Sequence, residues 1–185
     1  MEPVKNAVVT LEEKVQKAFA KLHLGQDSGL SDLWQLLSRR LLTLLRGLTG
    51  SSEDAEDLLQ ETFAKVFEKI GQHSPSRGSS IGWVYAIARN LGLQHLRRQR
   101  RAPPLLEPPS SVDPPDAVEA KIKWEKIEEA LQEIPIDLRL AFLLRECLGL
   151  NYAQMAQVSD RSPNQVASDL FRARQHLRRI LRNKI

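Results

Sequence analysis

Residues 151–179 read NYAQMAQVSDRSPNQVASDLFRARQHLRR, and the spacing of polar residues within this stretch indicates the class of fold. Asn151 and Gln154 have the spacing of a capping box, in which each side chain bonds the backbone N–H of the other residue. Ser162 and Gln165 repeat this spacing, and Pro163 between them suits the first position of a helix. A short helix, a tight turn and a longer capped helix predict a helix-turn-helix motif.

The longer of these two helices has an apolar side and a polar side. Its apolar residues recur every three or four positions from Val166 to Leu181, and we expect this side to be buried. Asp169 falls on the shoulder, about 80° from the centre of the apolar stripe. The opposite side carries Asn164, Ser168, Arg172, Gln175 and Arg179. Two interpretations stay open: a helix that reads DNA, or the last core helix of a small bundle.

Proline marks a boundary near the middle of the chain, since six of the ten prolines lie between residues 103 and 115. Because proline lacks a backbone N–H and restricts the residue before it, no helix is expected to cross this stretch. The sequence therefore predicts a helical domain over residues 1–102, a Pro-rich linker over 103–116 and a second helical domain over 117–185. Relative motion of two such domains is the default expectation.

Leucine-rich helical periods dominate both predicted domains without the alternation of a strand, so the expected fold class is all-α. Capping residues and glycines set the expected helix limits. Before the helix-turn-helix, we expect helices over about 11–22, from a cap at Ser31 to Leu48, from a cap at Ser51 or Ser52 to Ile70, over 81–101, over 117–133 and over 135–148.

Composition excludes several classes of protein. The 185 residues carry a formal net charge of +4 and a single cysteine, Cys147, so an internal disulfide is excluded and a reducing compartment is expected. The N-terminal stretch is too polar for a signal peptide, and no window approaches about 20 uncharged apolar residues. We therefore expect a soluble, cytosolic protein without a membrane span.

Patterns typical of catalysis or metal binding are missing from the sequence. The four histidines are dispersed, and there is no Gly-rich phosphate loop or Ser-His-Asp arrangement. Cys147 lies in an apolar predicted helix, which favours a core residue over a nucleophile. We expect no catalytic residue, no metal, no cofactor and no enzymatic activity.

The predicted helix after Ser51 has an acidic side. On a helical wheel its apolar residues gather on one side, and Asp54, Asp57, Glu61 and Glu68 gather on the other. A solvated charged face explains this pattern, and acidic residues in a first turn also suit the helix dipole. A docking surface for a basic partner is the alternative.

The predicted helix over 81–101 carries a polar stripe formed by Trp83, Asn90, Gln94, Arg97 and Arg101. Such side chains suit nucleic acid, because amides read base edges, arginines hold phosphates and an indole stacks on an unpaired base. The alternative is a core tryptophan followed by a basic helix end, which the helix dipole favours.

Taken in order, these segments resemble the sigma-70 family of bacterial transcription initiation factors, and most of all its small extracytoplasmic-function (ECF) group. DAEDLLQETF at 54–63 is similar to the part of region 2 that binds core polymerase. IARNLGLQHLRR at 87–98 is similar to the part that recognises the promoter −10 element. Residues 134–174 are similar to region 4 without a gap.

The resemblance implies binding to core RNA polymerase, through its beta-prime clamp and beta subunit, to promoter DNA and to an anti-sigma protein. Polymerase would meet Asp54, Asp57, Gln60 and Glu61. The −10 element would meet a loop over residues 72–80 that holds a flipped base, with Arg77, Trp83, Arg89, Asn90, Gln94, Arg97, Arg98 and Arg101. The −35 element would meet Ser162, Asn164, Gln165, Ser168, Arg172, Arg174 and Arg179.

The sequence departs from the family pattern at four places. Ile81-Gly82-Trp83 stands where Arg-Ala-Trp is common, and Gln94 where an acidic residue or Asn is common. In the helix-turn-helix, Ala167-Ser168-Asp169 replaces a usual Lys-Ser-Arg, and Asp160-Arg161 replaces a usual Gly-Ile. We therefore expect −35 binding weaker than is usual in the group, and we expect Asp169→Arg to strengthen it.

Two other functions fit the same residues. A stand-alone helix-turn-helix regulator would bind duplex DNA without engaging polymerase. A sigma-like interaction module would be bound mainly by an anti-sigma protein, and the reduced positive charge at 167–169 favours it.

Overall fold

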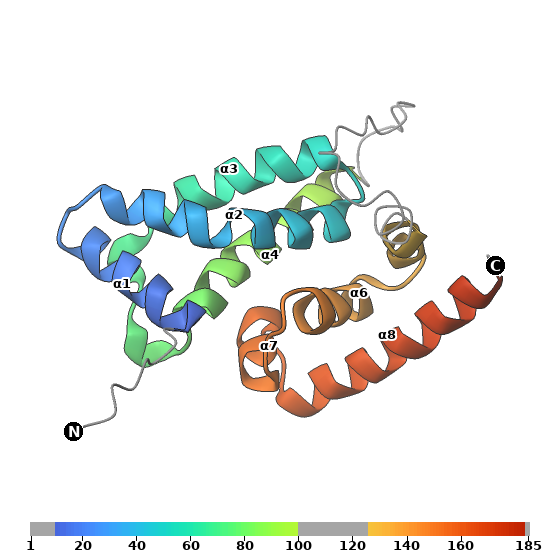
Figure 1. The fold of residues 1–185 in the computed structure, drawn as a ribbon. Helices are drawn as coiled ribbons and strands as arrows, with labels where there is room; N and C mark the ends of the chain where they lie inside the picture. The colour runs from blue at the N-terminus through green and yellow to red at the C-terminus, as the bar shows by residue number, and fades with distance from the viewer. Residues whose placement is uncertain (1–9, 100–125, 184–185) are drawn as a thin grey trace, which may run out of the picture.

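The structure, a computed structural model, describes residues 10–99 and 126–183 (Figure 1). Every regular element in these two ranges is helical, which confirms the all-α prediction, and none of their helices is long and apolar enough to cross a membrane. The helices of the first range are α1 (Leu11–His23), α2 (Ser28–Thr49), α3 (Ser52–Glu68), the short η1 (Ile70–Gln72) and η2 (Pro75–Arg77), and α4 (Ser80–Gln99). Those of the second are a helix over 126–132, α6 (Ile136–Phe142), η3 (Leu143–Cys147), α7 (Tyr152–Ser159) and α8 (Pro163–Asn183).

Polar side chains begin several helices where the sequence predicted. Ser51 caps α3 by accepting a hydrogen bond from the backbone N–H of Asp54, at 3.2 Å. Asn151 and Gln154 form both bonds of a capping box at the start of α7, at 2.9 and 3.0 Å. The predicted cap at Ser31 is wrong: α2 begins one turn earlier, at Ser28, and no side chain caps it.

The first four helices form a bundle around α2. Helix α1 packs across α2, and α3 and α4 pack along it, so that the leucine stripe of α2 is fully buried. The apolar side of α3 closes the bundle with Ala55, Leu59, Phe63 and Val66. These contacts leave the opposite side of α3 at the surface.

The second range folds as the predicted helix-turn-helix. Helices α7 and α8 are joined by a tight turn in which Asp160 adopts the left-handed conformation, with φ of 55°. Aspartate tolerates this conformation better than most residues, so the turn forms without the glycine that is common in the family at this point. Helix α6 continues into the π-helical turn η3 and packs against α8.

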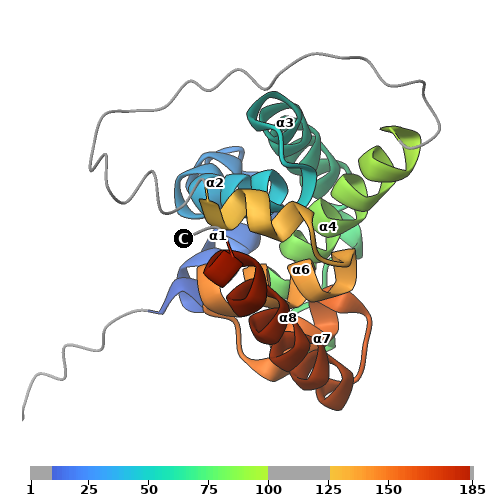
Figure 2. The ribbon, with the colours of Figure 1, turned by 90° about the vertical axis from the view of Figure 1, so that its right-hand side faces the viewer.

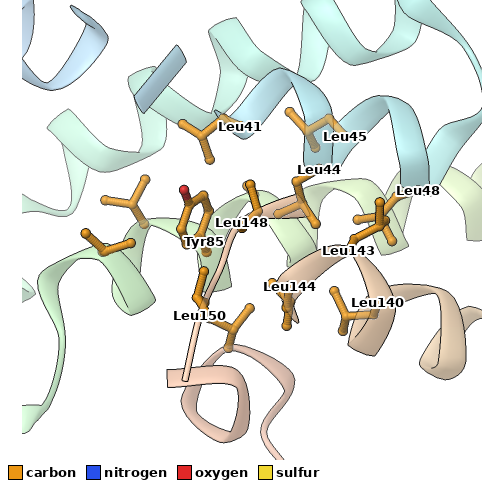
Figure 3. Close-up of a cluster of buried hydrophobic side chains, with 14 of the residues drawn as sticks. Leu41, Leu44, Leu45, Leu48, Tyr85, Leu140, Leu143, Leu144, Leu148 and Leu150 are labelled. Carbon is orange, nitrogen blue, oxygen red and sulfur yellow. The ribbon is translucent and has the colours of Figure 1, made fainter. Parts of the chain in front are cut away.

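The two ranges share one hydrophobic core instead of forming two separate bodies. Figures 1 and 2 show α6 and α7 lying against the first bundle, where α6 meets α2 and α7 meets α4, with α8 packed on the outer side of α6 and α7. In Figure 3 leucines from α2 and Tyr85 of α4 point toward leucines of the second range. The boundaries predicted at 102/103 and 116/117 lie outside the described residues, as does the predicted linker.

Hydrogen bonds and an ion pair lie at the edge of this shared core. The buried guanidinium of Arg139 on α6 donates to the backbone carbonyl of Leu48 at 2.7 Å and to that of Gln132 at 3.0 Å. Arg40 donates to the carbonyl of Leu148 at 3.2 Å, and Arg46 pairs with Glu128 at 3.0 Å. Because α2 ends in carbonyls without helical partners, Arg139 satisfies one that would otherwise be buried alone.

The close approach of the two ranges depends on Gly47 in α2, since a Cβ at this position would overlap the side chain of Leu143. We expect Gly47→Val to push the second range away from α2 and to raise the radius of gyration in small-angle X-ray scattering. Gly71→Val is the control, because a Cβ there meets nothing within 4 Å. Identical scattering from both variants at equal helix content would contradict the shared core.

Candidate nucleic-acid interface

An aromatic cluster and a cavity lie at the N-terminal end of α4. The rings of Phe19 and His73 stack with centroids 4.0 Å apart, and Trp83 meets His73 edge-on at 5.2 Å. Trp83 is therefore partly buried, with its indole forming a wall of the cavity and not a free surface group. The cavity measures about 270 Å³ and is lined by Gln72, His73, Ser74, Gly78, Ser79, Trp83 and Gln157.

Glu12 of α1 holds the loop over residues 72–80, which precedes α4, in place. The carboxylate of Glu12 accepts hydrogen bonds from the hydroxyl of Ser79 and the backbone N–H of Ser80, both at 2.6 Å. The Ser79 hydroxyl in turn accepts from the N–H of Gly82 at 3.1 Å and so caps α4. The sequence analysis gave Glu12 no role, because a residue that lies 67 positions from its partner leaves no local signal.

His73 links the loop to α1 and α4. Its Nε2 lies 3.1 Å from the Ser80 hydroxyl and its Nδ1 lies 3.4 Å from His23 Nε2. Burial lowers the pKa of His73, the neighbouring His23 lowers it further, and Glu12 opposes both. Burial thus favours the neutral imidazole, which suits a ring stacked on Phe19.

The residues of α4 predicted to meet the −10 element differ in their exposure. Asn90, Gln94, Arg97 and Arg98 are exposed along the second half of the helix. Arg89 is partly buried and faces the second range: burial lowers its pKa, while Asp160 and Asp137 act in the opposite direction. Arg77 belongs to η2, and Arg101 lies outside the described residues.

The acidic side of α3 is exposed at Asp57, Gln60 and Glu61. Asp54 differs from these, because it is partly buried and accepts a hydrogen bond from Gln99 of α4 at 3.1 Å. Beside this surface, Trp34 is 43% exposed while its ring packs on Phe63, with centroids 4.7 Å apart. Trp34 lines a groove of about 440 Å³ with Ser38, Arg39, Leu42, Glu56, Leu59 and Gln60.

The sequence analysis missed Trp34, although a signal was present. The residue sits next to Leu33 and outside the leucine stripe of α2. A large aromatic residue off the buried stripe of an amphipathic helix indicates either a second packing surface or an exposed contact point.

Helix α8 presents its predicted polar side to solvent. The buried stripe is confirmed at Val166, Leu170, Ala173 and Leu177. Ser162 and Gln165 form a capping box, with bonds of 3.3 and 2.9 Å. All seven residues predicted to meet the −35 element are exposed: Ser162, Asn164, Gln165, Ser168, Arg172, Arg174 and Arg179.

The exposed side of α8 also carries Phe171, which the sequence analysis missed. Its side chain is 62% exposed, one turn beyond Ser168. An apolar ring on a helix that enters a major groove can contact the methyl group of thymine. The position falls outside the apolar stripe, and this was the signal available in the sequence.

Asp169 lies on the shoulder of α8, and the structure shows that this shoulder is buried. Asp169 is 2% exposed, and its two carboxylate oxygens pair with Arg161 and Arg172, each at 2.6 Å. Arg161 also pairs with Asp137 on α6 at 2.6 Å. The departures at 161 and at 169 therefore belong to one ion-pair network that fastens the turn to α6 and α8.

Nothing in the described ranges resembles a catalytic or metal centre. No group of three or more His, Cys, Asp or Glu side chains comes together there as a metal site. Cys147 is partly buried, and burial raises the pKa of its thiol to about 11, which keeps it protonated and unreactive near neutral pH.

The helix-turn-helix with an exposed polar side, together with the amides and arginines along α4, defines a helical DNA-binding protein. Comparison with known families matches Sigma-70 region 2 at residues 33–102 and Sigma-70 region 4 at residues 124–177. The chain is 32% identical to the ECF RNA polymerase sigma-E factor of Haemophilus influenzae, over 73% of this chain and 76% of that protein. The chain belongs to the sigma-70 family, in its extracytoplasmic-function group.

Other relatives agree with this family. The RNA polymerase sigma-H factor of Pseudomonas aeruginosa is 27% identical over 92% of this chain and 95% of its own length. The fold matches CnrH in complex with the cytosolic domain of CnrY, with a TM-score of 0.72 and 18% identity over 94% of this chain and 98% of that one. It also matches the sigma factor RpoE in complex with the anti-sigma factor NepR from Bartonella quintana, with a TM-score of 0.71 and 22% identity over 82% and 96% of the two chains.

The neutral state of His73 makes stability depend on pH. In the unfolded chain His73 takes up a proton near its usual pKa of 6.5, whereas in the folded protein it does so only at lower pH. Its contribution is therefore complete above about pH 6.5 and is lost as pH falls toward the lowered pKa. We expect the free energy of unfolding, measured in urea, to fall below pH 6.5, and to fall less in His73→Phe. Parallel pH profiles for the two proteins would refute this role.

Burial of Asp169 reverses the expectation for its substitution. Asp169→Asn leaves two guanidinium groups without their carboxylate, so we expect urea unfolding to show a loss of about 2 kcal/mol. Asp137→Asn is the control, because this carboxylate is 52% exposed and its loss should cost less than about 1 kcal/mol. Asp169→Arg should destabilise the domain further and weaken DNA binding. Equal unfolding energies for the two Asn variants would contradict the buried network.

Proposed function

We propose that this protein binds core RNA polymerase and directs it to promoters, with region 2 recognising and opening the −10 element and region 4 binding the −35 element. The observation that supports this most is the occurrence of both family regions, in order, with all seven predicted −35 residues at the surface of α8. DNA opening would be driven by binding energy and by capture of unpaired bases on an aromatic side chain. We place this function in the bacterial cytoplasm.

Region 2 supplies a surface for polymerase on α3. Asp57, Gln60 and Glu61 are exposed and form an acidic patch suited to a basic partner, and the groove around Trp34 adds an apolar anchor beside it. Interfaces of this kind combine aromatic anchors with a charged rim. Asp54, tied to Gln99, would hold α3 and α4 together beneath this patch.

The cavity at the start of α4 would receive a base flipped out of the −10 element. A nucleobase is flat and can stack on an aromatic ring such as Trp83, while backbone groups of Ser79 can bond its edge. Asn90, Gln94, Arg97 and Arg98 continue along α4 and would follow the strand beyond that base.

Region 4 would place the first turns of α8 in the major groove of the −35 element. Asn164, Ser168 and Phe171 provide hydrogen-bonding and apolar groups for base edges. Arg172 and Arg179 then bind phosphates. The ion pair between Arg172 and Asp169 neutralises part of the positive charge that Arg172 offers to a phosphate. This arrangement supports −35 binding that is weaker than is usual in the group.

The packed arrangement of the two ranges cannot meet both elements at once. Elements about 25 bases apart are separated by roughly 85 Å along B-form DNA at 3.4 Å per base pair. Helices α4 and α7 are in direct contact in the structure. The two ranges would therefore separate on polymerase.

An anti-sigma protein is a partner that fits the packed arrangement. The solved structures with the same fold hold CnrH with the cytosolic domain of CnrY, and RpoE with the anti-sigma factor NepR. A protein that bound across both ranges of this chain would keep them together and away from polymerase.

Run-off transcription with purified core polymerase and fragmented genomic DNA tests the function. We expect promoter-dependent transcripts only when this protein is added to core enzyme. The absence of such transcripts from any fragment would sink the proposal. Binding of the free protein to duplex DNA without co-purification of polymerase would favour a stand-alone regulator.

The acidic patch on α3 can be tested with two variants of equal net charge. The double variant Asp57→Asn/Glu61→Gln raises the net charge by two and should weaken binding to core polymerase about tenfold, or about 1.4 kcal/mol. The control Gln16→Lys/Gln26→Lys adds the same charge at exposed positions on and after α1. Affinities measured by fluorescence anisotropy should separate the two variants, and equal affinities would remove α3 from the interface.

A further inference from the structure

A glutamine of the helix-turn-helix reaches into the cavity at the start of α4. The side-chain oxygen of Gln157 on α7 accepts a hydrogen bond from the backbone N–H of Ser79 at 3.0 Å. Its amide nitrogen donates to the backbone carbonyl of Ser79 at 3.2 Å. One primary amide thus occupies both backbone groups of a single loop residue that lies 78 positions away.

The loop has room for this amide only because it carries glycine at two positions. A Cβ at Gly82 would lie 2.7 Å from the side-chain oxygen of Gln157, and a Cβ at Gly78 would lie 2.8 Å from it. Gly82 is also one of the positions where the sequence departs from the family pattern, since alanine is common there.

The groups that Gln157 occupies are those that a nucleobase would use. A primary amide presents an acceptor oxygen beside an amino donor, and adenine presents the same pair at N7 and N6. Gln157 lines the same cavity as Trp83, whose ring is the surface on which a base would stack. A base cannot bond the N–H and carbonyl of Ser79 while the amide holds both.

We propose that Gln157 occupies the base-capture site as an internal substitute for a nucleobase, so that the packed protein cannot capture a −10 base. This inference rests on the proposed function, in which the loop over residues 72–80 receives a flipped base. Separation of the two ranges on polymerase withdraws α7 together with Gln157 and exposes the site. DNA capture is thereby confined to protein that is bound to polymerase.

The shared leucine core makes this exclusion effective. The core holds α7 beside α4, so the amide competes for Ser79 from a high effective concentration. Two ordinary hydrogen bonds are then sufficient to exclude a base that arrives from dilute solution. The same two bonds would be negligible between separate molecules.

Binding of short single-stranded DNA to the free protein tests the proposal. The probes are fluorescein-labelled homopolymeric 12-mers of deoxyadenosine, deoxycytidine and thymidine, and the measurement is fluorescence anisotropy in moderate salt, which screens simple phosphate binding. We expect Gln157→Ala to bind the tightest of these probes about tenfold more tightly than the wild-type protein. Gln16→Ala, which removes an exposed amide on α1, should bind like the wild-type protein.

A second variant displaces the Gln157 amide by a change in α4. Gly82→Ala keeps Gln157 and adds the Cβ that displaces its amide, so it should also tighten binding, and it provides the answer if Gln157→Ala does not fold. Unchanged affinity in both folded variants would overturn the proposal. Tighter binding by Gln16→Ala to the same extent would overturn it as well.

The protein bound to core polymerase separates this inference from the function on which it rests. If the ranges are apart on polymerase, the wild-type protein and Gln157→Ala should bind the probes equally well there. Failure of both complexes to bind any probe would refute base capture by the loop. Equal binding on polymerase together with equal binding by the two free proteins would leave base capture intact and refute the role of Gln157.

Discussion

The packing of α2 leucines against the leucines of α6 and η3 is the interaction on which the rest of the structure depends. Leu44, Leu45 and Leu48 are fully buried, and the helix that carries them is also the centre of the first bundle. Burial of leucine side chains is worth roughly 1.5–3 kcal/mol each, so this surface holds two differently built halves as one body. Arg139 can be buried because the same packing gives its guanidinium two backbone carbonyls as hydrogen-bond acceptors, those of Leu48 and Gln132.

The leucine stripe explains how much of the fold could be predicted. Periodicity and caps gave the helices and the helix-turn-helix, because each of these depends on residues three or four positions apart. The prediction of a cap at Ser31 failed because α2 begins at Ser28 without a side-chain cap. Gly29 in its first turn packs closely against Ala18 and Leu22 of α1, and a contact between two helices leaves no local signal in the sequence. The shared core could not be predicted from the sequence, since the side of α2 that meets η3 has the same leucine pattern as the rest of the buried stripe.

The site residues could also be predicted where the signal was local and not where it came from distant parts of the chain. Exposed positions on α3, α4 and α8 were found because a polar side of an amphipathic helix is a local property. Trp83 and Arg89 were found in the right helix, but their surroundings come from Phe19, His73 and the second range, which no spacing within α4 reveals. The burial of Asp169 could not be predicted, because a wheel position about 80° from the apolar centre is compatible with burial or exposure, and only a partner such as Arg161 decides between them.

The leucine core also determines what a productive partner must do. Separation of the two ranges exposes leucines that are now buried, so a partner that opens the protein must bind the separated halves more tightly, in sum, than they bind each other. Weak DNA contacts cannot meet that requirement, because Asp169 holds Arg172 and only neutral groups begin α8. Polymerase, with surfaces for both regions, can meet it. Opening is therefore coupled to polymerase and not to DNA, and this order makes it useful to block the base-capture site until polymerase is bound.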